Sequence, residues 1–129
     1  MNHLKEHVSP RTVHTIASIP KDKLETQGTL AKVLLVLPRL QRRSLGVETL
    51  YEPKPGQRHN LAWTAPTATD PRVVLLALEP GYVALEPGSS QDAVTWILAK
   101  PGDVILLGSD EVMHYTLQVG KRVLVYYLG

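Results

Sequence analysis

The sequence predicts an all-β protein, namely a single antiparallel β-barrel or jelly roll with an extended N-terminal arm. The chain has 129 residues, of which 43% are hydrophobic, and this is enough for one domain with its own core. From residue 73 onward, short apolar runs alternate with turns rich in proline and glycine, as in β-sandwiches and barrels. No segment shows a convincing helical period over three turns.

The predicted arm covers residues 1–29, which are polar and mixed and are broken by Pro10 and Pro20. Within it, residues 12–19 are rich in β-branched side chains, so we expect an edge strand there. Residues 20–25 have room for one helical turn at most. The arm is therefore expected to be extended and to carry one strand.

The predicted barrel domain covers residues 30–129. Residues 30–37 are apolar, and Pro38 stops them, so they read as a strand. Residues 52–56 form a turn, because two prolines fix φ and a glycine follows them. Residues 65–71 are expected to be a loop. The remaining predicted strands are residues 45–51, 60–64, 73–78, 82–85, 93–98, 104–107, 112–119 and 122–128.

Composition excludes several classes of protein. The chain has no cysteine, so a disulfide scaffold, a thiolate metal site and cysteine nucleophile chemistry are ruled out. No apolar run reaches the ~18 residues of a membrane span, and the first residues lack the apolar region of a secretory signal. We therefore expect a cytoplasmic protein without a membrane partner.

The basic residues do not form a nucleic-acid site of the usual kind. The only dense basic group is Arg39, Arg42 and Arg43, and no aromatic residue lies among them. Nucleic-acid binders usually show a longer basic stripe with interleaved aromatic residues. We interpret the group as a solvated loop, with a phosphate or partner contact as the alternative, and expect no nucleic acid. The nucleophile elbow, the phosphate-binding loop, the dinucleotide fingerprint and the zinc-protease motif are absent from the sequence.

The C-terminal half contains a more specific pattern. Residues 100–107 read Lys-Pro-Gly-Asp-Val-Ile-Leu-Leu, and after a turn come His114-Tyr-Thr and the apolar run 123–127. This order resembles the second motif and final strands of the cupin family, in which a Pro-Gly-Asp turn launches a strand and a histidine begins the next one. Residues 52–56 are similar to the turn before the first cupin motif. The resemblance covers roughly residues 30–128 and implies a cupin-like barrel.

The chain departs from the family at the metal ligands. The first cupin motif runs Gly, five residues, His-x-His, then a Glu. Counted from Gly56, the two histidine positions hold Ala62 and Thr64, and the Glu position near residues 71–74 is not acidic unless Asp70 serves. His114 itself comes one residue later than the family spacing.

A single imidazole cannot hold a divalent ion against water. His59 is not a substitute ligand, because its odd offset from Ala62 would place it on the opposite face of a strand. We therefore expect a protein with no metal and no other cofactor, whose stability a chelator leaves unchanged. If a metal were present, it would be divalent Fe, Mn or Zn, bound through His114.

His114 is the candidate catalytic residue, as a general base oriented by an acidic partner. Candidate partners are Asp110, Glu111 and Asp70. The resemblance places His114 inside the barrel. The alternation along residues 112–119 instead places it on the surface, provided that the apolar set packs between the sheets, and a one-residue bulge would reconcile the two.

The candidate ligand-binding residues are Trp63, Thr64, His114, Thr116 and Tyr82. Trp63 lies where the inward-facing family motif lies, so it is the better pocket candidate of the two tryptophans. Trp96 is expected in the core, where a large aromatic side chain is usually buried.

Three functions are consistent with these features. The first is a metal-free cupin-like domain that binds a small molecule or acts as a sensor. The second is a structural or assembly protein that uses the barrel surface and the N-terminal arm. The third is a small cupin-type enzyme, such as an isomerase, a lyase or a dioxygenase-like protein, that uses His114. Because uncovered strand edges favour pairing, we also expect a homodimer formed through the arm and residues 30–37.

Overall fold

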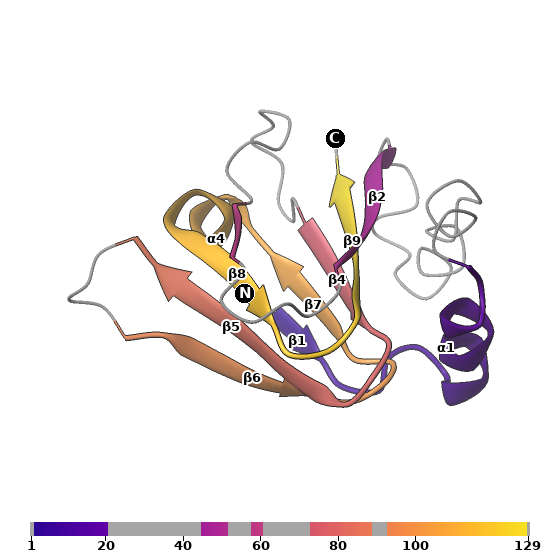
Figure 1. The fold of residues 1–129 in the computed structure, drawn as a ribbon. Helices are drawn as coiled ribbons and strands as arrows, with labels where there is room; N and C mark the ends of the chain where they lie inside the picture. The colour runs from indigo at the N-terminus through magenta and orange to yellow at the C-terminus, as the bar shows by residue number, and fades with distance from the viewer. Residues whose placement is uncertain (1, 21–44, 52–57, 61–72, 89–92, 129) are drawn as a thin grey trace.

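The computed structural model describes residues 2–20, 45–51, 58–60, 73–88 and 93–128, and it contains two antiparallel β-sheets (Figure 1). Sheet A has the strand order β1-β7-β4-β9-β2, and sheet B has the order β3-β8-β5-β6. The strands are β1 (Asn2–Leu4), β2 (Leu45–Tyr51), β3 (His59–Asn60), β4 (Val73–Ala77), β5 (Gly81–Pro87), β6 (Thr95–Ala99), β7 (Val104–Leu107), β8 (Tyr115–Val119) and β9 (Val123–Leu128). The described helices are α1 (Pro10–Ala17) and α4 (Ser109–His114).

The strand order is that of a jelly roll. Apart from β1, each sheet has four strands, and the chain crosses between the sheets after β2, β3, β4, β6, β7 and β8. Every pairing is antiparallel. Eight antiparallel strands in two sheets with this connectivity are the jelly-roll arrangement. The expected mostly β, jelly-roll-like architecture is confirmed, while closure into a barrel stays a prediction.

The core lies in two layers, one on each side of sheet A. Between the sheets, Leu75, Ile105 and Val125 of sheet A pack with Leu85 and Leu117 of sheet B. The other face of sheet A packs against the N-terminal segment, including α1, through a second cluster: Val8, Val13, Ile16, Val74, Leu76, Leu78, Val104, Leu106 and Leu124. Because both faces of β4 and β7 are covered, these strands are continuous apolar runs and do not alternate.

The expected strand at residues 12–19 is wrong, since residues 10–17 form α1. Ser9 caps the helix by accepting a hydrogen bond from the Thr12 N–H, and Pro10 occupies the first turn, where its missing N–H costs nothing. Val13 and Ile16 lie one helical turn apart and are both buried against sheet A. Burial of this apolar face outweighs the strand preference of the β-branched residues.

The first 20 residues are not an extended arm. β1 pairs with β7 of its own chain as the edge strand of sheet A, with Asn2 opposite Leu106 and Leu4 opposite Val104. The N-terminal segment therefore does contain an edge strand, but this strand is Asn2–Leu4 and not residues 12–19. Residues 21–29 and the predicted strand at 30–37 lie outside the described residues, as does the basic group at residues 39–43.

Most of the remaining strands agree with the sequence pattern. Residues 45–51 and 104–107 form β2 and β7 as expected, and β4, β5, β6 and β9 differ only at their ends. The predicted strand at 112–119 is correct for residues 115–119, which form β8. It is wrong for residues 112–114, which belong to α4. Asp110 and Glu111 lie in the first turn of α4, where acidic side chains are favourable. None of the helices within the described ranges is both long enough and apolar enough to cross a membrane.

Candidate functional site

His114 lies at the C-terminal end of α4, and its side chain is exposed. Leu117, in contrast, is fully buried between the sheets, and Tyr115 packs against the same cluster. The exposed side chain differs from the interior placement that the resemblance implies, and because His114 belongs to a helix, the alternation of a strand does not apply to it. Asp110 is exposed on the same short helix, and no described hydrogen bond or ion pair joins it to the His114 side chain. The catalytic role of His114 stays a prediction.

The predicted ligand-binding residues do not come together in the described structure. Thr116 lies opposite Glu86 on sheet B, four positions along β5 from Tyr82 and thus about 13 Å away. Trp63 and Thr64 lie outside the described residues, as does Asp70. Within the described residues, no group of three or more His, Asp or Glu side chains is placed to hold a metal ion.

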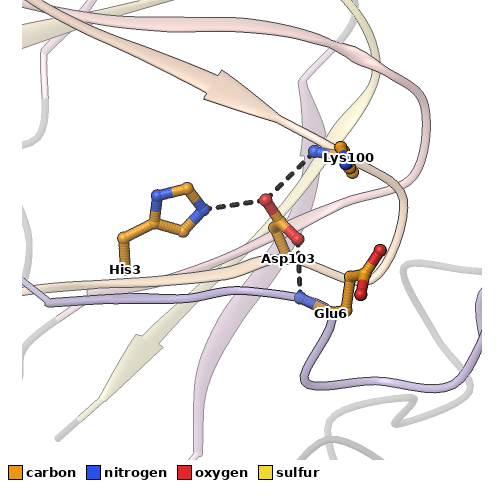
Figure 2. A network of polar contacts seen from close by, with 4 residues as sticks. All are labelled: His3, Glu6, Lys100 and Asp103. Atoms are coloured by element: carbon orange, nitrogen blue, oxygen red, sulfur yellow. Dashed lines mark hydrogen bonds and ion pairs between the residues drawn. The ribbon is translucent and has the colours of Figure 1, made fainter.

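In the Pro-Gly-Asp turn that carries the family resemblance, the Asp103 side chain joins the turn to the N-terminal segment (Figure 2). We call the contacts of Asp103 with His3, Glu6 and Lys100 the clasp. Asp103 is 2% exposed, and both of its carboxylate oxygens accept hydrogen bonds. Oδ1 accepts from the Glu6 backbone N–H at 2.7 Å. Oδ2 accepts from the His3 ring Nε2 at 2.8 Å and from the Lys100 backbone N–H at 3.1 Å. One buried carboxylate thus joins β1 and the segment after it to the turn between β6 and β7.

Gly102 completes the clasp because no other residue fits its position. Its φ is +94°, and a Cβ there would lie 2.3 Å from the Val8 carbonyl oxygen. The Val8 N–H donates to the Gly102 carbonyl oxygen at 3.0 Å, and the Gly102 N–H donates to the Ala77 carbonyl oxygen at 3.0 Å. The glycine therefore allows the N-terminal segment to lie directly against the turn.

The clasp predicts a loss of stability in acid. Burial alone would raise the pKa of Asp103, but hydrogen bonds from the Glu6 and Lys100 backbone and interaction with His3 bring it below its ordinary value of 3.8. A carboxyl group whose pKa is lower in the folded state stabilises the fold above its unfolded pKa, and this stability is lost as the pH falls through the folded pKa. Urea denaturation of wild type and of Asp103→Asn should show a difference in unfolding free energy that is constant above about pH 5 and shrinks below about pH 4. A difference that does not change down to pH 2 would contradict this role.

A hollow lies beside the clasp. Its volume is about 200 Å³, and its lining residues are Lys5, Glu6, Leu98, Lys100 and Asp103. The carboxylate of Asp103 is already occupied by the three hydrogen bonds described above, so the groups free to contact a neighbouring molecule are the exposed side chains of the rim. Leu98 lines the hollow and also lies on the outer face of sheet B.

The outer face of sheet B carries an apolar patch at one edge. Among the side chains that the structure describes, the exposed large hydrophobic residues are Val94, Trp96 and Leu98, which are 36%, 63% and 83% exposed. Trp96 and Leu98 point outward from β6, while Ile97 and Ala99 alternate with them and are buried. The expectation that Trp96 lies in the core is wrong, because both faces of β6 are apolar and period-two alternation cannot tell which one is covered.

Tyr82 packs against Trp96 at one side of this patch. Its ring and that of Trp96 lie edge to face, with centroids 5.3 Å apart and an interplanar angle of 62°. A Cβ on Gly120 would lie 2.4 Å from the Tyr82 ring, so the absence of a side chain there lets the ring pack against the backbone. Further along the same face, Glu86 is paired with Arg58, and the surface becomes polar. Among the described residues, the exposed apolar surface thus lies in the region of β6, and we call Val94, Trp96 and Leu98 the β6 patch.

Comparison with known proteins adds little to this geometry. No family model matches the chain, and a search of curated proteins finds no relative. Among solved structures, the chain is similar to a prolyl-4-hydroxylase of Pseudomonas putida, with a TM-score of 0.46 and 12% sequence identity. That similarity covers 98% of this chain and 90% of the other.

Proposed function

We propose that this chain is a cupin-like jelly-roll interaction module that binds an extended, apolar protein segment by adding it as a strand alongside β6. The observation that carries the proposal is that all the exposed large hydrophobic side chains of the described residues lie on this strand or immediately before it. Single exposed apolar residues are normal on a protein surface, whereas a contiguous group of them is typical of an interaction site.

Strand addition suits β6 because of its place in the sheet. Among the strands that the structure describes, β6 is the last one of sheet B and pairs with β5 alone, so the backbone groups of its other edge face away from the sheet (Figure 1). In this mode of recognition, main-chain hydrogen bonds supply affinity and alternate side chains supply specificity. Trp96 and Leu98 are the alternate side chains that a bound strand would contact.

The packing between the sheets supports a surface function over an interior one. In the described part of the interior, Leu75, Leu85, Ile105, Leu107 and Leu117 are at most 2% exposed and pack in one cluster. These aliphatic side chains contact one another in the space between the sheets. The small-molecule and enzyme hypotheses stay predictions, and His114→Ala remains the variant that tests the enzyme.

A peptide-binding measurement tests the proposal. The probe is a fluorescein-labelled peptide with the sequence of residues 94–100, Val-Thr-Trp-Ile-Leu-Ala-Lys, titrated with the full chain and followed by anisotropy. We expect saturable binding, weakened about tenfold or more by Leu98→Lys in the protein, since a charge would enter the apolar contact. The matched control peptide carries Ile97→Pro, which removes one N–H and cannot continue a ladder.

Equal binding of the proline peptide and the parent peptide would contradict strand addition. The absence of binding by the parent peptide to a chain shown to be monomeric would also contradict it. The first outcome does not depend on whether the chain pairs with itself, and the second is read only where the chain is monomeric.

A further inference from the structure

We infer that the strand that β6 accepts is the β6 of a second copy of this chain, so that the two B sheets join edge to edge around a twofold axis. This inference rests on the proposed function and names its partner. It differs from the expectation of dimerisation through the N-terminal arm and residues 30–37, which stays a prediction. In the described part of the arm, β1 and α1 pack on sheet A of their own chain.

The four sheet edges are not equally protected. β1 has three residues and β3 has two, and very short strands offer little for another chain to pair with. β2 is longer, but its register shifts between Leu45 and Glu48, and it contains a charged residue. β6 has five residues, Thr-Trp-Ile-Leu-Ala, with no charge, no proline and no shift in its pairing with β5. The devices that proteins use to prevent edge-to-edge association are therefore missing from this edge alone among those described.

The side chains of β6 are complementary to a second β6. In an antiparallel pairing centred on Ile97, Trp96 of one copy lies opposite Leu98 of the other, and the symmetry produces this pair twice. Residues directly opposite each other in an antiparallel ladder lie on the same face, so both pairs form on the outer face. The two most exposed hydrophobic side chains of the described residues then cover each other, which makes the contact isologous.

The charge that directly follows β6 is compatible with this register. Lys100 is exposed and follows the strand directly. In the register centred on Ile97, the two copies of Lys100 lie at opposite ends of the ribbon, six positions or about 20 Å apart. That separation exceeds the screening length of about 8 Å at physiological ionic strength, so the two ammonium groups do not oppose the pairing.

The size of the contact predicts a reversible dimer. Two five-residue strands with four large side chains form a smaller contact than the 1,200–2,000 Å² or so of a standard stable interface. The dimer should therefore dissociate on dilution. Joining two four-stranded sheets would produce one continuous eight-stranded sheet across the pair.

Sedimentation velocity over a concentration series tests the inference. The wild-type chain should shift from monomer to dimer as its concentration rises. Leu98→Lys should remain monomeric at concentrations at which the wild type is mostly dimeric. Leu98 is 83% exposed, so the variant should keep its fold, and circular dichroism with a thermal melt verifies this. Leu98→Gln is a second, uncharged variant that should weaken the dimer in the same direction. Thr15→Lys is the matched control, because it adds the same charge at an exposed position on α1 and should dimerise like the wild type.

The outcomes separate this inference from the function on which it rests. A wild-type chain that stays monomeric at every concentration, yet binds the peptide of residues 94–100, overturns the self-pairing and leaves strand addition intact. A dimer that Leu98→Lys does not weaken overturns the self-pairing through β6. A monomer that also fails to bind the peptide overturns both proposals.

Discussion

Replacement of Asp103 with alanine is expected to lower the free energy of unfolding by about 3 kcal/mol, because three donors lose their acceptor at once. The Glu6 and Lys100 backbone N–H groups and the His3 ring all donate to this carboxylate. A hydrogen bond to a charged group contributes about 1.5–3 kcal/mol, and a buried donor left unpaired costs about 1–3 kcal/mol. The estimate lies below the sum of these values because neighbouring bonds are not additive.

Urea denaturation at pH 7, followed by circular dichroism, measures this loss. For a domain of this size, it corresponds to a melting temperature lower by about 10 °C. Asp110→Ala is the matched control, since Asp110 is exposed and should change the stability by about 0.5 kcal/mol or less. If the two variants are equally stable, Asp103 does not anchor the N-terminal segment.

Gly102→Ala is expected to cost about 3 kcal/mol or more, for two reasons that act together. The positive φ of +94° is strained for any residue with a Cβ, at about 1–3 kcal/mol. The new Cβ would also lie 2.3 Å from the Val8 carbonyl oxygen, which is backbone and cannot turn aside. Relief of that overlap must move the N-terminal segment away from the turn and stretch the bond from the Val8 N–H to the Gly102 carbonyl oxygen.

Gly88→Ala provides the control for Gly102→Ala. Gly88 is exposed, and the nearest atom to its new Cβ would be the His114 carbonyl oxygen at 3.9 Å, which is an ordinary contact. Thermal melts of both variants should show a large loss for Gly102→Ala and almost none for Gly88→Ala. Equal losses would mean that replacing either glycine destabilises the chain to the same extent. The close approach to Val8 would then not explain the effect of Gly102→Ala.

The sequence predicts a strand correctly where the burial of a segment and its local conformational preference favour the same structure. β7 is a short apolar run between a Pro-Gly-Asp turn and Gly108, and its bounds match the expectation. The sequence does not predict α1, because its β-branched residues favour a strand. Its helical form depends on the packing of Val13 and Ile16 against sheet A. The Ser9-Pro10 pair is the local signal that could have revealed it, as a helix cap followed by a first-turn proline.

The candidate site shows the limit of sequence reasoning more clearly. Trp96 and Leu98 alternate with Ile97 and Ala99, and all four residues are apolar, so no pattern indicates which pair faces outward. That choice depends on the order of the strands in the sheet, which is a tertiary property. The Pro-Gly-Asp motif was visible as a turn, but its contact with His3 joins residues 100 positions apart and leaves no local trace.

The central claim, that β6 pairs with β6 of a second copy, is tested most directly by cysteine cross-linking. The chain has no native cysteine, so any disulfide reports the introduced positions alone. Residues that face each other in an antiparallel ladder have Cα atoms about 4.5–5.5 Å apart, within the range of a disulfide. Trp96→Cys and Leu98→Cys are prepared separately, mixed in equal amounts and oxidised. Pairing centred on Ile97 predicts that the mixture forms covalent dimers in higher yield than either variant alone. A mixture that cross-links no better than the separate variants would contradict it.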